Sequence, residues 1–143
     1  MNEKALNFLG LMRKANAIQI GETDTGAAVR AQHARLIVIA SDASGNARKR
    51  AESFVYGRNV PLIEVPFSKE EISDKVGKNG CSMAAICDIG FADAFIKALC
   101  ADEPEKYADT AVIIEESLKK ANKLKQERKT HETNKRNGKR RKN

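Results

Sequence analysis

The sequence predicts an α/β domain with helices on both sides of a sheet, that is, a three-layer α/β/α sandwich. Residues 36–40 (LIVIA) form an unbroken apolar run, which is typical of a strand buried on both faces. Two further short apolar runs, at 60–65 and 82–87, are separated from it by segments of about ten residues with helical character. Strands that alternate with helices favour a sheet that is covered on both faces.

The expected strands are short apolar segments, in chain order residues 18–20, 36–41, 60–65 and 82–87. The first is expected at an edge of the sheet and ends at Gly21. The third contains Pro61, which has no N–H to donate and therefore belongs at the start of a strand or on an edge.

The expected helices alternate with these strands and cover residues 3–15, 22–33, 44–56, 68–77 and 91–99. The first is amphipathic, with apolar residues at helical spacing. Ser44 stands at the N-cap position of the third, where its hydroxyl can accept a hydrogen bond from a free backbone N–H. Ser68 and Glu71 have the spacing of a capping box, which opens the fourth helix. Asp88 is expected to be a cap or turn residue before the fifth.

The positive charge is concentrated at the C-terminal end. The chain carries a net charge of +7, yet residues 1–103 hold equal numbers of basic and acidic residues, whereas residues 119–143 hold 12 basic and two acidic ones. A helix with a narrow apolar stripe is expected beyond Pro104. After Leu124 no aliphatic or aromatic residue remains to offset the entropy of ordering. We therefore expect a domain at 1–101 that folds by itself, a helical extension at 102–128 and a basic tail at 129–143, disordered when free.

Several classes of protein have no support in the sequence. Three cysteines without a CxxC pair favour free thiols in a reducing compartment over a zinc site or disulfides. No apolar run approaches the roughly 20 residues that span a bilayer, and the N-terminus does not resemble a signal peptide. Residues 77–80 (GKNG) lead into a strand, which favours a turn over a phosphate loop. We expect a cytoplasmic protein with no enzymatic activity, metal or cofactor.

The basic tail has two interpretations. It is a solubilising extension, or it is an arm that binds nucleic acid. The cluster Lys139, Arg140, Arg141 and Lys142 has no interleaved acidic residue, which suits the neutralisation of phosphates. Such contacts supply affinity and carry no sequence information.

An ordered set of segments adds a resemblance that covers roughly residues 1–100. The segments are LNFLGLMRKANAIQIGET, ARLIVIASDAS, VPLIEVPFSKEEI, KVGKNG and AAICDIGFADAFIKAL. In this order they resemble the kink-turn RNA-binding ribosomal-protein superfamily, specifically its bacterial YlxQ-like branch. The resemblance implies a three-layer sandwich with a mixed four-stranded sheet that binds sharply bent RNA.

The resemblance also implies where RNA would bind. A motif of the type Gly-Thr-Asn-Glu-x-x-Lys, at the start of a helix, reads the RNA kink in that family. Its glycine falls on Gly21, its Thr position on Glu22, its Asn and Glu positions on Thr23 and Asp24, and its Lys position on Ala27. Thr23 and Asp24 retain polar groups for a guanine edge, whereas Ala27 offers no charge.

The family's second contact surface is the loop before the last strand, here Lys78, Asn79, Gly80, Cys81 and Ser82. An ordinary turn is an equally good interpretation of this loop. Arg48, beside the turn at residues 41–44, is expected on the same rim of the sheet, where it reaches a phosphate or lies on a solvated helix face.

These observations favour a monomeric, non-enzymatic RNA-binding protein of ribosomal-protein type. Its partner is structured RNA, ribosomal RNA included, and no membrane is involved. The alternative is a protein-interaction module on the same fold that has lost specific RNA recognition. A small-ligand or nucleotide-binding α/β enzyme remains a third class, since a fold does not determine a function.

Overall fold

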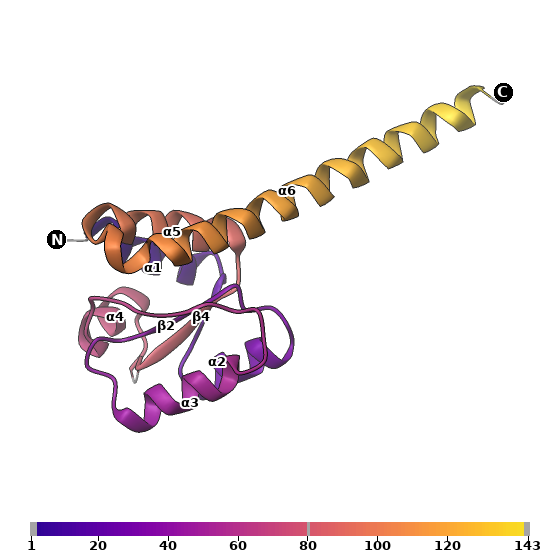
Figure 1. Cartoon of the computed structure of the whole chain (residues 1–143). Coiled ribbons are helices and arrows are strands. Elements are labelled where there is room, and N and C mark those ends of the chain that lie inside the picture. Colours follow the sequence, from indigo (N-terminus) through magenta and orange to yellow (C-terminus); the bar gives the residue numbers. More distant parts are fainter. Residues whose placement is uncertain (1–2, 80, 142–143) are drawn as a thin grey trace.

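A four-stranded sheet lies between two layers of helices in the computed structural model of the chain (Figure 1). The structure describes residues 3–79 and 81–141, with the backbone alone described for residues 129–141. The strands are β1 (Ile18–Ile20), β2 (Leu36–Ile39), β3 (Leu62–Glu64) and β4 (Met83–Ile86). The helices are α1 (Glu3–Lys14), α2 (Glu22–Arg30), α3 (Gly45–Val55), α4 (Lys69–Val76), α5 (Ile89–Asp102) and α6 (Pro104–Arg141).

The sheet is mixed, with the strand order β1-β4-β2-β3. Strands β2 and β3 are parallel, while β4 runs antiparallel to both β1 and β2. β1 and β3 are the edge strands, and Pro61 directly precedes β3, as its missing N–H requires. The predicted fold class, a mixed four-stranded sheet in an α/β sandwich, is confirmed.

Alternate residues of the central strands face the two helical layers. Ile37 of β2 and Ala85 of β4 pack with Ala28 and Val29 of α2. Their neighbours along the strands, such as Val38, join the larger core beneath α1 and α5. Because both faces are covered, the central strands are apolar at every position, which is the pattern that the sequence showed.

Side-chain caps begin three of the helices at the predicted residues. The Ser44 hydroxyl accepts from the Ala47 N–H at 3.1 Å, and Asp88 accepts from the Phe91 N–H at 2.9 Å. Ser68 opens α4 with both hydrogen bonds of the capping box. Helix α2 ends earlier than predicted, at Arg30, because Gln32 takes a left-handed conformation with φ 62° that turns the chain toward β2.

Helix α6 contributes to the core as well as extending beyond it. Tyr107 and Ile114 are each only 1% exposed, and the Tyr107 hydroxyl donates to the Glu64 carbonyl at 2.7 Å. The backbone is helical as far as Arg141, past the expected helix end near 128. Residues 105–137 contain neither proline nor glycine, so nothing in them interrupts a helix. Disorder of 129–143 in the free protein stays a prediction.

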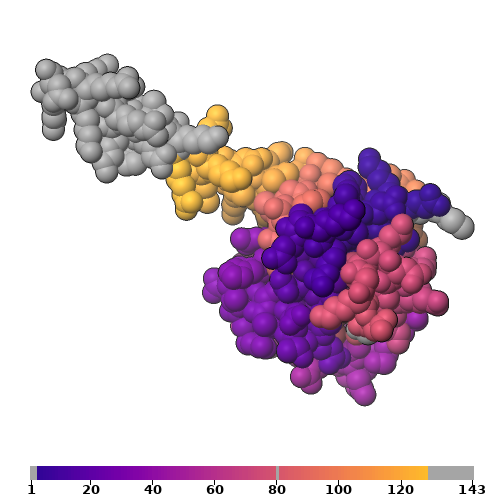
Figure 2. Space-filling view, turned by 180° about the vertical axis from the view of Figure 1, so that it is seen from behind, coloured from indigo at the N-terminus to yellow at the C-terminus, as the bar shows by residue number. Residues whose placement is uncertain are grey.

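The described part of α6 leaves the body of the domain as a single helix (Figure 2). Within the described residues, no helix combines the length and the apolar character that crossing a bilayer requires.

Candidate functional site

The three segments singled out in the sequence meet at one edge of the sheet, which we call the proximal rim. Residues 21–24, 41–44, 78–79 and 81–82 lie here because the carboxyl ends of β1 and β2 coincide with the start of β4. The Gly21 N–H donates to the Met83 carbonyl at 3.0 Å, and the Ala40 N–H donates to the Ser82 carbonyl at 2.9 Å. The carboxyl ends of strands in open α/β sheets are common ligand sites.

Gly21 begins α2 in a backbone conformation that favours glycine, with φ 94° and ψ 164°. No side chain caps this helix, so its first N–H groups are available to an external acceptor. Nothing lies within 4 Å of the position that a Cβ of Gly21 would take, so the approach to this end is open. Glu22 and Asp24 in the first turn also stabilise the helix dipole, which is a structural reason for their presence.

Lys78 joins the two surfaces implied by the resemblance. Its ammonium donates to the Ile20 carbonyl and to Asp24 Oδ2, each at 3.3 Å. The side chains of Lys78 and Asp24 remain nearly half exposed in this ion pair. The buried Cys81 thiol donates to the Lys78 carbonyl at 2.9 Å and so holds the loop. Sequence reasoning predicted both segments but missed this contact.

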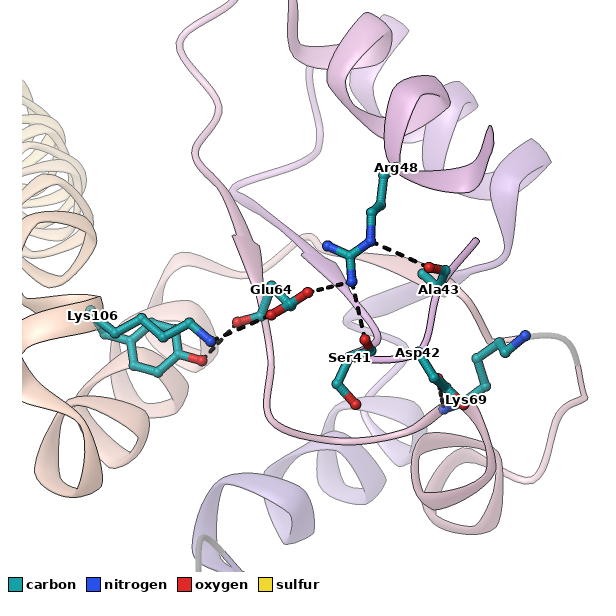
Figure 3. Close-up of polar contacts among 8 residues, drawn as sticks. Ser41, Asp42, Ala43, Arg48, Glu64, Lys69 and Lys106 are labelled. Carbon is teal, nitrogen blue, oxygen red and sulfur yellow. Dashed lines mark hydrogen bonds and ion pairs between the residues drawn. The ribbon is translucent and has the colours of Figure 1, made fainter. Parts of the chain in front are cut away.

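Arg48 is engaged within the protein. Its guanidinium donates to the carbonyls of Ser41 and Ala43 and forms an ion pair with Glu64 (Figure 3). The hydrogen bond from Arg48, with a further contribution from Lys106, lowers the pKa of Glu64 below its ordinary value. The predicted role of Arg48 as a phosphate contact would require an anion to compete with this carboxylate.

The remaining predicted residues are distributed as follows. Glu22 forms a long ion pair with Arg50 at 3.7 Å, while Thr23 and Asn79 are exposed. Gly80 and Lys142 lie outside the described residues. For Lys139, Arg140 and Arg141 the structure describes only the helical backbone of α6. Their predicted contacts with RNA stay predictions.

A cavity of about 500 Å³ runs beside α2 from the proximal rim toward the opposite edge of the sheet. Asp24 and Ala27 line its rim end, and Ala31, His33 and Arg35 line the other. Ala27, the position at which the family motif has lysine, therefore faces open space, and a longer side chain could be accommodated there.

The described residues offer neither a cluster of metal ligands nor an activated Cys87 thiol. Among the described residues, no three His, Cys, Asp or Glu side chains lie close enough together to hold a metal ion. Burial raises the pKa of the Cys87 thiol, which opposes its ionisation to a nucleophilic thiolate near neutral pH.

The sheet, its helical layers and the glycine-led helix at the rim define the class expected from the resemblance, an α/β sandwich of ribosomal-protein type. The chain belongs to the ribosomal protein L7Ae/L30e/S12e/Gadd45 family, whose model matches residues 3–96.

Within this family the chain resembles bacterial proteins named RNA-binding protein YlxQ, which confirms the predicted YlxQ-like branch. It is 36% identical to the Enterococcus faecium protein over 90 residues, covering 63% of this chain and 85% of that protein. It is 30% identical to the Bacillus subtilis (strain 168) protein over 92 residues, covering 64% and 91% respectively.

Two solved structures share the fold. A protein with unknown function from Bacillus halodurans C superposes with a TM-score of 0.61 and 23% identity, over 66% of this chain and 95% of that one. The Giardia lamblia 15.5kD RNA binding protein superposes with a TM-score of 0.52 and 18% identity, over 65% and 79% respectively. At these identities the similarity concerns the fold.

Proposed function

We propose that this protein binds structured RNA at the proximal rim and acts there without catalysis, as a cytoplasmic monomer. The observation that carries the proposal is the uncapped start of α2 at Gly21, joined through Asp24 to Lys78 of the neighbouring loop. Relatives that match most of the domain bear the name RNA-binding protein, which supports the same class of partner.

The chemistry of the rim suits an RNA bend of the kink-turn type. The free N–H groups of α2 are donors for a phosphate or a base oxygen. Asp24 can accept from a guanine amino group, and the Thr23 hydroxyl can donate or accept. Lys78 places a cation beside these groups, and a cation there suits contact with a backbone phosphate.

The basic end of the chain adds affinity in this proposal. The described part of α6 carries exposed Lys119, Lys120 and Lys123, and the sequence beyond continues with further basic residues. Cations on such a segment release counterions from the RNA, which gives binding that weakens steeply with salt.

A protein-interaction module is the second candidate, and the charge pairing at the rim favours it. Arg48, Arg50 and Lys78 each face an acidic partner within the protein. A rim whose cations are neutralised attracts phosphate less than a rim with unpaired cations does.

Paired affinities for a kink-turn RNA and a straight duplex of the same length test the proposal. Asp24→Ala should weaken binding to the kinked RNA by on the order of 1–3 kcal/mol, because it removes an acceptor to a guanine edge. Binding to the duplex should change little, since phosphate contacts dominate there. Asp74→Ala is the matched control, because it removes an exposed acidic side chain from α4, away from α2.

Lys78→Met separates the acceptor role of Asp24 from its ion pair. This substitution removes the ion pair between Lys78 and Asp24 but leaves the Asp24 carboxylate in place. If the preference for kinked RNA survives in Lys78→Met and disappears in Asp24→Ala, the Asp24 carboxylate is the group that contacts the guanine edge. If the full-length protein binds kinked and straight RNA equally, the protein-interaction candidate replaces the proposal.

A further inference from the structure

Residues 1–103 carry no net charge, but their exposed basic side chains are not spread evenly between the two edges of the sheet. The edge opposite the proximal rim, which we call the distal edge, is where the backbone N–H of Arg35 donates to the Ile86 carbonyl and the backbone N–H of Cys87 donates to the Ala17 carbonyl. Its exposed basic side chains are Arg13, Lys14, Arg30, Arg35 and Arg58, whereas the acidic residues at the ends of its elements are Asp88 and Glu52, the latter in the last turn of α3. Asp88 is itself engaged in capping α5.

The direction of the helices places these cations together. Helices α1 and α2 both end at the distal edge, which brings Arg13 and Lys14 to the end of one and Arg30 to the end of the other. Arg58 follows α3, and its guanidinium donates to the Val29 carbonyl in the last turn of α2 at 3.3 Å. Arg35 lies directly before β2.

The cations of the distal edge and those of the proximal rim differ in whether an acidic side chain pairs with them. At the rim Arg48, Arg50 and Lys78 are paired with acidic side chains. None of the distal cations forms an ion pair within the part of the chain that the structure describes. The distal edge therefore carries five cations that have no ion-pair partner among the described residues.

Two grooves meet at Arg35 and connect this edge to both the rim and α6. The cavity of about 500 Å³ extends from Asp24 to Arg35 along α2. A second cavity of about 290 Å³ continues from Arg35 to Ala121 and Leu124 of α6. The nine residues of α2 span roughly 14 Å at about 1.5 Å each, which is the length of about four stacked nucleotides at 3.4 Å.

Tyr56 adds a π-face to the same edge. It is 87% exposed at the end of α3, two residues before Arg58. Every other aromatic side chain in the described residues is buried or half-buried. An exposed aromatic ring at an edge that carries arginine side chains suits the stacking of an unpaired base.

We propose that the distal edge is a second RNA-binding surface, on which Arg30 and Arg35 hold the phosphodiester backbone and Tyr56 stacks on an unpaired base. The strand reaches it from the rim through the groove beside α2 and continues toward the basic residues of α6. The proposal rests on the RNA-binding function above and extends it to a second contact. An acidic protein is the alternative occupant.

The test uses the full-length protein and measures affinity against salt for a kink-turn RNA with a single-stranded extension. The double variant Arg30→Gln with Arg35→Gln should weaken binding on the order of tenfold at 0.1 M salt. The slope of log affinity against log salt should fall by about 1.4–1.8, because two phosphate contacts are lost. The matched control is Lys4→Gln with Lys49→Gln, which removes two exposed cations that lie away from the distal edge. Its slope should change by less than half as much.

Tyr56 is tested separately on an unstructured oligonucleotide. Tyr56→Ala should weaken binding about tenfold, while Tyr56→Phe keeps the ring and the affinity. Arg13→Gln with Lys14→Gln provides a second neutralisation at the same edge, and circular dichroism verifies the fold of each variant.

Equal effects of the distal and control double variants would overturn the proposal, as would an unchanged affinity in Tyr56→Ala. In both cases the preference for kinked RNA, which depends on Asp24, would remain, so the function at the rim would stand. Absence of any RNA binding by the full-length protein would overturn both proposals.

Discussion

Removal of α6 tests whether residues 1–101 fold without this helix. The sequence predicts that residues 1–101 fold alone, whereas the structure places Tyr107 and Ile114 in the core, each 1% exposed. Loss of a buried aromatic side chain costs about 3–5 kcal/mol and loss of a buried isoleucine about 2–5 kcal/mol. The sum, roughly 5–10 kcal/mol, is comparable with the entire stability of a typical domain. From the packing we expect the 1–101 fragment to lose most of its stability.

Urea unfolding monitored by circular dichroism measures this difference. A chain that ends at residue 124 is the control, because it keeps both buried side chains and removes only the basic end. It should match the full-length protein within about 1 kcal/mol. Tyr107→Phe should cost about 0.5–1.5 kcal/mol, since it deletes only the hydrogen bond to the Glu64 carbonyl.

Cooperative unfolding of the 1–101 fragment, with a free energy within about 2 kcal/mol of the full-length value, would contradict this expectation. That result would show that α5 repacks without α6. The boundary near residue 101 would then separate an independent domain from an appended helix.

Three further predictions concern binding and pH. Thr23→Asn with Ala27→Lys restores the family motif and should strengthen binding to kinked RNA but not to a straight duplex; equal strengthening of both would contradict a reading role. Removal of residues 125–143 should flatten the salt dependence of binding to unstructured RNA and leave the melting temperature unchanged, which a salt titration and a thermal melt check. Arg48 and Lys106 hold the pKa of Glu64 below 4.5, so its ion pairs stabilise the fold above that pH and lose this effect as pH falls through the lowered pKa. Glu64→Gln should therefore reduce the acid sensitivity of unfolding, by less than about 1 kcal/mol because the group is more than a third exposed.

Local features of the fold were predictable because each depends on a few adjacent residues. Ser44, Ser68 and Asp88 cap helices through hydrogen bonds to N–H groups three residues away. Pro61 indicated the start of a strand or an edge strand, because it has no N–H for a neighbour. The mixed character of the sheet was predicted from the family resemblance, whereas the antiparallel placement of β4 between β1 and β2 was not predicted.

The contacts that define the rim could not be predicted from local sequence. Lys78 and Asp24 are 54 positions apart, and their meeting depends on the direction in which β4 enters the sheet. The pairing of Arg48 with Glu64 likewise depends on the parallel arrangement of β2 and β3. The clustering of cations at the distal edge emerges only once the ends of α1, α2 and α3 are known. In the sequence these cations are scattered, and residues 1–103 contain as many acidic as basic residues.

Gly26, inside α2, lies in close contact with Phe54 of α3. A Cβ added at Gly26 would lie 2.9 Å from the Phe54 ring of α3, closer than carbon atoms approach one another. To fit even a methyl group, the ring must swing aside or α2 must lift from α3. If the helix moves away from α3, Gly21 and the N–H groups of the first turn move with it as a rigid unit. In that case a single small side chain at position 26 would change the angle at which α2 presents its first N–H donors.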